Sequence, residues 1–117
     1  MILNMQQRLQ SISPLVRKVT AQEAAKECAQ NKGTVLDVRE PAECETSPVK
    51  ASINIPRGVL EMKIIEKFKD PNHPFYIHCA SGVRAQLAAE QLIHMGYTTV
   101  SAITCDIKTL TSVNFSD

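Results

Sequence analysis

The chain has 117 residues with 13 basic and 12 acidic side chains, so its formal net charge is +1. This length fits one domain, and the near-neutral charge argues against a surface for nucleic acid or anionic membranes. No apolar run approaches the length of a membrane span. Met1 to Leu15 lacks the basic start and long apolar centre of a secretory signal. We therefore expect a cytoplasmic protein, or a periplasmic one if a signal peptide was removed.

The four cysteines, Cys28, Cys44, Cys79 and Cys105, are widely spaced and form no C-x-x-C pair. Because the chain is long enough for an ordinary core and shows no secretory signal, we expect reduced thiols rather than disulfides. A zinc site built from cysteine and histidine needs clustered ligands, and His78 beside Cys79 is the only near pair. We therefore expect no metal.

Residues 1–14 are predicted to form an amphipathic extension, and residues 15–117 the domain itself. The apolar side chains of the extension fall on one helical face: Met1, Ile2, Met5, Leu9 and Ile12. Ser13-Pro14 ends this pattern. The simplest interpretation is a helix folded back onto the domain, or a frayed terminus. The alternative is a helix for docking or dimerisation.

Residues 16–19 have a weak strand pattern. Thr20 and Glu23 have the spacing of a capping box, which predicts that a helix begins at Ala21. Gly33 is the expected C-terminal cap of this helix, because glycine takes the left-handed conformation that ends many helices.

Thr34 to Val38 has the continuous apolar character of a strand inside a parallel sheet. Asp37 and Arg39 lie at its carboxyl end, the edge at which open α/β sheets bind ligands. Asp37 is a candidate to orient the neighbouring loop. The simpler interpretation is a structural ion pair, with Arg39 bound to an acid. Pro41 to Glu45 suits a short helix with proline in its first turn.

Residues 53–55 predict a very short strand, and residues 59–68 predict a helix with one apolar side. A turn-rich segment, Asp70 to Pro74, precedes the apolar strand at residues 75–78.

A loop then joins this strand to a helical pattern. Cys79 opens the loop and Arg84 closes it, with Gly82 providing the conformational freedom that a tight turn needs. A strand followed directly by a helix aims backbone N–H groups and the positive helix end at the loop, a setting that favours a thiolate. The simpler interpretation of Cys79 is a buried, inert cysteine. His78 precedes it on the strand, so its side chain should point the other way and be structural.

From Ala85 to Met95 the apolar residues follow helical spacing. The polar residues of this helix are expected to face solvent: Gln86, Glu90, Gln91 and His94. Residues 98–103 predict the last strand. Five strands alternating with helices predict an α/β fold, a mainly parallel sheet with helices on both faces.

Cys79 to Arg84 resembles the active-site loop of the rhodanese-type sulfurtransferases. Two other segments match this family in the same order, Val35 to Pro41 and Ala51 to Pro56. The resemblance covers about residues 16–103 and implies a rhodanese-like fold with strand order 1-5-4-2-3. After Ile103 relatives often have two glycines, whereas this chain has Thr104-Cys105-Asp106, so the pocket wall there is expected to differ.

The resemblance implies that Cys79 takes a sulfane sulfur from a donor such as thiosulfate, holds it as a persulfide and passes it to a thiol or to cyanide. Arg84 would hold the loop or the charged end of the donor, and Arg57 near the rim would attract an anion, unless it is simply a solvated side chain. A sulfur-accepting protein is a further candidate partner, and no cofactor is needed. The anion-binding groups would be the loop amides: Ala80, Ser81, Gly82, Val83 and Arg84.

Two alternatives stay open. Cysteine phosphatases also close a cysteine loop with arginine, but they place five residues between the two, whereas this chain has four. The other alternative is a sulfur-relay or binding module with little turnover alone. Ala80 and Ser81 carry no charge, whereas some relatives that use thiosulfate have a basic residue in the loop. Weak thiosulfate activity is consistent with this difference.

Overall fold

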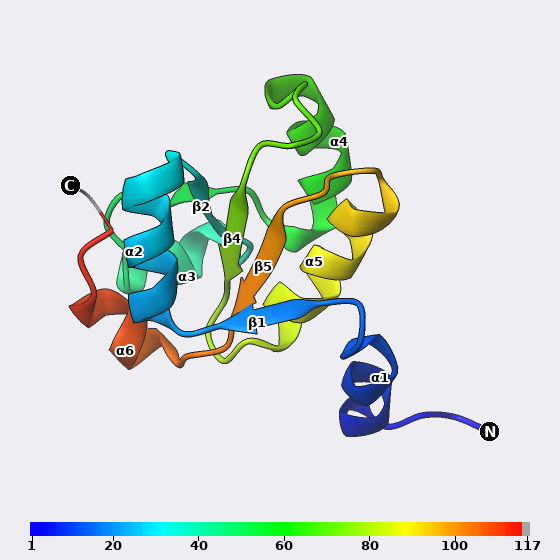
Figure 1. Ribbon diagram of the computed structural model, residues 1–117. Helices are drawn as coiled ribbons and strands as arrows, with labels where there is room; N and C mark the ends of the chain where they lie inside the picture. Colours follow the sequence, from blue (N-terminus) through cyan, green and yellow to red (C-terminus); the bar gives the residue numbers. More distant parts are fainter. Residues whose placement is uncertain (116–117) are drawn as a thin grey trace.

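The computed structural model describes residues 1–115 and shows a five-stranded sheet between two layers of helices (Figure 1). The strands are β1 (Arg17–Val19), β2 (Thr34–Asp37), β3 (Ile53–Asn54), β4 (Phe75–His78) and β5 (Val100–Ile103). They pair in parallel in the order β1-β5-β4-β2-β3. This confirms the predicted fold class and strand order. The last two residues of the predicted domain, 116–117, lie outside the described residues.

The helices are α1 (Met5–Ile12), α2 (Ala21–Asn31), α3 (Pro41–Thr46), α4 (Leu60–Lys67), α5 (Val83–His94) and α6 (Ile107–Ser112), with a 3₁₀ turn, η1, at Arg57–Val59. In Figure 1, α2 and α6 lie on one side of the sheet and α4 and α5 on the other. α3 follows β2 at the carboxyl edge of the sheet, where the expected site lies.

Alternation along the strands divides the apolar side chains into two cores. Leu36 and Ile77 point into the core that α1, α4 and α5 cover. Val35 and Tyr76, their sequence neighbours, point into the core that α2 and α6 cover. The central strand β4 is buried on both faces, which explains why its sequence reads as a continuous apolar run.

The start of α2 follows the sequence prediction. Thr20 accepts a hydrogen bond from the Glu23 amide at 3.1 Å, and Glu23 accepts one from the Thr20 amide at 2.8 Å. The prediction for its end was wrong, because Lys32 rather than Gly33 takes the left-handed conformation, with φ 58°. Gly33 is needed for close packing instead, since a Cβ there would lie 2.9 Å from the Tyr76 ring.

The N-terminal segment folds back onto the domain. α1 begins at Met5, not at Met1, because Asn4 caps it; Met1 and Ile2 precede the helix and are exposed. Ile12 enters the core beneath α5.

Arg8 on α1 pairs with Glu90 on α5 at 2.6 Å. Glu90 is therefore buried and not solvent-facing as its position in the helical pattern predicts. A distant helix that covers it cannot be inferred from the local pattern.

α6 was not predicted. Asp106 caps it by accepting a hydrogen bond from the Thr109 amide at 2.9 Å, and Leu110 anchors it in the core. Its six residues include threonine and serine, which have low helix propensity, so packing and the cap stabilise it rather than local preference.

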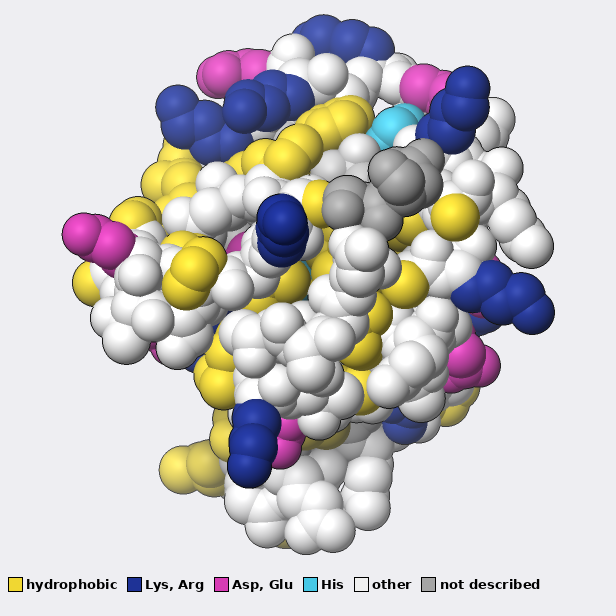
Figure 2. Space-filling model, turned by 90° about the vertical axis from the view of Figure 1, so that its left-hand side faces the viewer, with side chains coloured by type: hydrophobic (Ala, Val, Ile, Leu, Met, Phe, Trp, Pro, Cys, Tyr) yellow, Lys and Arg dark blue, Asp and Glu magenta, His cyan; other side chains and the backbone are white. Residues whose placement is uncertain are grey.

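The outer surface carries charges of both signs. Figure 2 shows the face on the left of Figure 1, where Asp and Glu side chains lie close to several of the Lys and Arg side chains. Hydrophobic side chains are visible between them. Among residues 1–115, no helix has the length and apolar character that crossing a bilayer requires.

Because only 4% of Ile12 is exposed, we expect Ile12→Ala to lower the free energy of unfolding, by about 2–5 kcal/mol, the usual cost of emptying a packed site. Met5→Ala on the same helix is the control: Met5 is 50% exposed, and we expect a change within about 0.5 kcal/mol. Urea denaturation measures both. Equal, small effects would show that α1 does not contribute to the core.

Candidate functional site

The parallel register brings two loops together at the carboxyl edge of the sheet. Asp37 at the end of β2 is level with His78 at the end of β4. The segment after β2 therefore lies beside the loop that begins at Cys79, and the Val38 amide donates to the His78 carbonyl at 3.1 Å. In open α/β sheets this edge is where ligands bind.

Cys79 lies at the amino end of α5 and is only 1% exposed. The Gly82 amide donates a hydrogen bond to Cys79 Sγ at 3.1 Å. The Gln86 amide makes the first helical bond, to the Gly82 carbonyl at 3.1 Å. The amides of Val83 and Arg84 therefore have no acceptor within the helix, and the positive end of α5 faces the loop. This arrangement can stabilise a negative charge on sulfur.

Gly82 allows the loop to be this short. Its φ is +95°, and a Cβ there would lie 3.0 Å from the Thr104 Cα. Thr104 follows β5, so the loop packs directly on the turn formed by Thr104-Cys105-Asp106. A side chain at position 82 would both strain the backbone and collide with that turn.

Arg84 extends to α3 rather than into the loop. Its guanidinium donates two hydrogen bonds to the Glu43 carboxylate, at 2.7 and 2.9 Å. These bonds, together with the Glu40 amide, lower the pKa of Glu43 to about 2, and they raise the pKa of Arg84. Arg84 thus ties the loop to α3.

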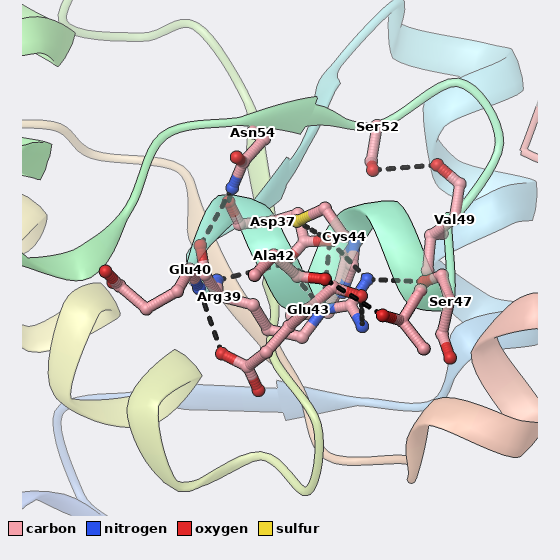
Figure 3. Close-up of polar contacts among 12 residues, drawn as sticks. Asp37, Arg39, Glu40, Ala42, Glu43, Cys44, Ser47, Val49, Ser52 and Asn54 are labelled. Carbon is pink, nitrogen blue, oxygen red and sulfur yellow. Dashed lines mark hydrogen bonds and ion pairs between the residues drawn. The ribbon is translucent and has the colours of Figure 1, made fainter.

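Asp37 and Arg39 form a buried ion pair beneath α3 (Figure 3). Arg39 Nη2 lies 2.7 Å from Asp37 Oδ2 and also 2.7 Å from the Ser47 carbonyl oxygen, to which it donates. Burial raises the pKa of Asp37, but the bonds from Arg39, the nearby His78 and the bond from Cys44 together outweigh burial, and the net pKa is lowered. Asn54 on β3 donates to the carbonyls of Asp37 and Arg39, each at 2.9 Å. The pair holds the segment after β2 in place.

His78 is fully buried on the face of the sheet opposite Cys79. Its Nδ1 is 3.9 Å from Asp37, and neither ring nitrogen has a hydrogen-bond partner among the described residues. Burial lowers the pKa of the imidazole, which keeps the ring neutral. As expected from strand alternation, His78 does not point toward the thiol.

The other three cysteines lie in different settings, and all four are free thiols. Burial raises the pKa of Cys28 to about 11. Burial, with a hydrogen bond to Asp37, raises the pKa of Cys44 to about 11. Cys105 accepts a hydrogen bond from the Ala21 amide at 3.3 Å. Within residues 1–115, no group of three histidine, cysteine or acidic side chains is placed to hold a metal ion.

Arg57 is paired with Glu61 at 2.9 Å, one turn along the chain. It does not line the depression of about 430 Å³ that lies beside the Cys79 loop. The residues of this depression come from α3, the segments flanking it, the loop and α6: Arg39, Ala42, Glu43, Thr46, Ser47, Ala80 and Ile107.

Sequence reasoning did not connect Glu43 or Ile107, among others of these residues, with the site. Glu43 precedes its partner Arg84 by 41 residues, and no local pattern indicates that contact. Ile107 belongs to α6, whose weak helical signal gave no reason to expect it beside the loop.

We expect Gly82→Ala to destabilise the protein more than Gly96→Ala. Both glycines have positive φ, +95° and +109°, but nothing lies within 4 Å of a Cβ at Gly96. The backbone penalty of about 1–3 kcal/mol applies to both variants, and the collision with Thr104 only to the first. Thermal and urea unfolding measure the difference. Equal losses of stability in the two variants would show that the turn at Thr104 can move aside without a measurable energetic cost.

The pKa of Glu43 provides a test of the Arg84 contact. In the wild type the carboxyl group should titrate at about 2, and in Arg84→Gln it should move toward the unperturbed value of about 4.3. Because the folded pKa is depressed, the pair contributes stability above about pH 4.3 and loses it as the pH falls toward 2. Carbon-13 NMR titration of the Glu43 carboxyl group in both proteins measures this. An unchanged midpoint in Arg84→Gln would contradict the assignment.

The comparisons with known proteins agree with this geometry. A rhodanese-related protein from Thermoplasma volcanium is 31% identical, over 80% of this chain and 89% of that one, with a TM-score of 0.66. The polysulfide-sulfur transferase homodimer of Wolinella succinogenes is 24% identical, over 87% and 77% of the two chains, with a TM-score of 0.72. A Rhodopseudomonas palustris protein described as a possible tyrosine phosphatase is 23% identical, over 91% and 87%, with a TM-score of 0.78. The last two likenesses show the fold alone.

No curated protein matches the chain in a sequence search. The family model of the rhodanese-like domain matches residues 20–111, which contain strands β2 to β5, the Cys79 loop and Arg84. The chain belongs to the rhodanese-like domain family.

Proposed function

We propose that the chain is a sulfurtransferase that carries a sulfane sulfur as a persulfide on Cys79. One observation carries the proposal: Cys79 Sγ lies at the amino end of α5 and accepts a hydrogen bond from the Gly82 amide at 3.1 Å. Such a setting stabilises a thiolate, which is the nucleophilic form of cysteine. Membership of the rhodanese-like family supports the same reaction class.

The reaction has two halves. In the first, the Cys79 thiolate attacks the sulfane sulfur of the donor; with thiosulfate, the S–S bond breaks and its electron pair leaves on sulfite. In the second, an acceptor thiolate attacks the outer sulfur of the persulfide, and the electron pair of that S–S bond returns to Cys79. The loop amides stabilise the single negative charge that the outer sulfur carries between the two halves.

Arg84 acts in this scheme as the residue that holds the loop in shape. Its two bonds to Glu43 fix α5 against α3. In this proposal they keep the amides of Ala80 to Arg84 oriented toward the sulfur that Cys79 carries. Cyanide, small thiols and a sulfur-accepting protein are the acceptor classes that this proposal includes. The reaction needs no metal and no organic cofactor, because the sulfur atom supplies the covalent chemistry itself.

The structural neighbour described as a possible tyrosine phosphatase raises the main alternative. A phosphatase needs a protonated group to assist the leaving oxygen. Glu43 is the carboxylic acid among the residues that line the depression, and its pKa of about 2 keeps it ionised at neutral pH. The loop also has four residues between Cys79 and Arg84, one fewer than the phosphatase loop. We therefore favour sulfur transfer.

We expect incubation with polysulfide or thiosulfate to add 32 Da, the mass of one sulfur atom, to Cys79. Intact-mass analysis and peptide mapping of the product measure the addition. Cys79→Ser should abolish it, and Cys44→Ser, the control, should retain it because the raised pKa of Cys44 leaves little thiolate to react. Sulfur retained by Cys79→Ser, or hydrolysis of an aryl phosphate that depends on Cys79, would contradict the proposal.

A further inference from the structure

One carboxylate, that of Glu43, lines the depression beside Cys79. Its side chain is 38% exposed, and both of its oxygens accept hydrogen bonds from Arg84. A small anion that approaches Cys79 from this side therefore meets an ion pair and not a free cation.

The two arginines nearest the site are both neutralised. Arg84 donates to both oxygens of Glu43, and Arg39, which lines the depression, is buried against Asp37 and the carbonyls of Glu43 and Ser47. Neither guanidinium is left without a carboxylate partner. The next cation along the chain there, Lys108 on α6, is exposed but does not line the depression.

The loop itself accommodates one negative charge, that of a thiolate or a persulfide. Its amides and the end of α5 supply partial positive charge but no full one. A thiosulfate ion has two negative charges, and because Glu43 already neutralises Arg84, no unpaired cation among the residues that line the depression balances them. The rest of the wall is apolar, formed by Ala42, Ala80 and Ile107, and suits an uncharged or cationic organic group.

We propose that Glu43 is a specificity-determining residue: it selects thiols and persulfides that have no negative charge next to the reacting sulfur, and it disfavours thiosulfate. This inference rests on the proposed sulfurtransferase function. In the step concerned, the acceptor thiolate forms a bond to the outer sulfur of the Cys79 persulfide. The bond between the two persulfide sulfurs breaks, and its electron pair returns to Cys79 as a thiolate. No oxidant is consumed.

The test uses Glu43→Gln, which removes the charge and frees Arg84. Glutamine at this position can still accept the hydrogen bond from the Glu40 amide, so the start of α3 is preserved. Both proteins are loaded with sulfur from polysulfide. They are then reacted with three thiols of similar size: cysteamine, which is cationic, 2-mercaptoethanol, which is neutral, and 3-mercaptopropionate, which is anionic.

For each thiol, the rate with the variant is divided by the rate with the wild type, which cancels the thiol's own reactivity. We expect this ratio to rise from cysteamine to 3-mercaptopropionate, by about tenfold across the series. The kcat/KM for thiosulfate should also rise by about tenfold in Glu43→Gln, mainly through a lower KM. In Glu43→Gln, added salt should lower kcat/KM for thiosulfate toward the wild-type value, because salt screens the attraction to the freed Arg84.

Glu23→Gln is the matched control. Glu23 occupies the same capping-box position at the start of α2, but it does not line the depression. It should leave the ratios near one for all three thiols. If polysulfide fails to load Cys79 in the wild type, the proposed function is wrong. If loading is normal but Glu43→Gln gives equal ratios and an unchanged thiosulfate kcat/KM, the role of Glu43 is wrong. If Glu43→Gln does not fold, Arg84→Gln provides the test. It leaves the Glu43 carboxylate unpaired and should lower the rate with 3-mercaptopropionate more than the rate with cysteamine; equal changes would contradict the role of Glu43.

Discussion

The site depends on how sharply the chain turns from β4 into α5. Between His78 and Val83 it must leave the sheet, pass close to Thr104 and begin a helix, with the Gly82 amide just before that helix donating to the Cys79 sulfur. Gly82 makes this possible, because it takes a positive φ in a space where a Cβ would meet the Thr104 backbone at 3.0 Å. A longer loop would move the helix end away from the sulfur and reduce its electrostatic effect, which falls off within the first turn.

Two ion pairs then hold the surroundings of this turn. Asp37 and Arg39, both buried, fix the segment after β2, and Arg84 joins the loop to Glu43 on α3. The second pair is partly exposed, so its contribution to stability is small and screened by solvent. Its importance lies in its effect on the net charge near the site. Because Arg39 and Arg84 are each paired with a carboxylate, they hold neighbouring segments together and add little net positive charge to the opening of the site.

Sequence reasoning predicted the parts whose signals are local. The burial of β4 on both faces, the capping box of Thr20 and Glu23, and the loop between Cys79 and Arg84 all appear as short patterns, and the fold follows from their order. What it missed depends on contacts between distant segments. α6 is held by Leu110 in the core and not by helix propensity, and Glu90 is buried because Arg8 reaches it from α1. The same reason hid Glu43: its partner is known only when α3 and α5 are placed side by side.

The four cysteines show that the residue type alone does not determine whether a thiol is a candidate nucleophile or a structural side chain. Cys28 is a small core residue, and Cys44 donates its proton toward Asp37, so for both the thiol is the favoured form and the pKa rises to about 11. Cys79 is more deeply buried than Cys28, with 1% against 8% of its surface exposed, yet its sulfur accepts a hydrogen bond from the Gly82 amide. Burial without a donor disfavours the charged form of a thiol, whereas an amide that donates to the sulfur favours it. It is the polarity of the immediate neighbours, set by the backbone turn, that distinguishes the candidate nucleophile from the structural thiols.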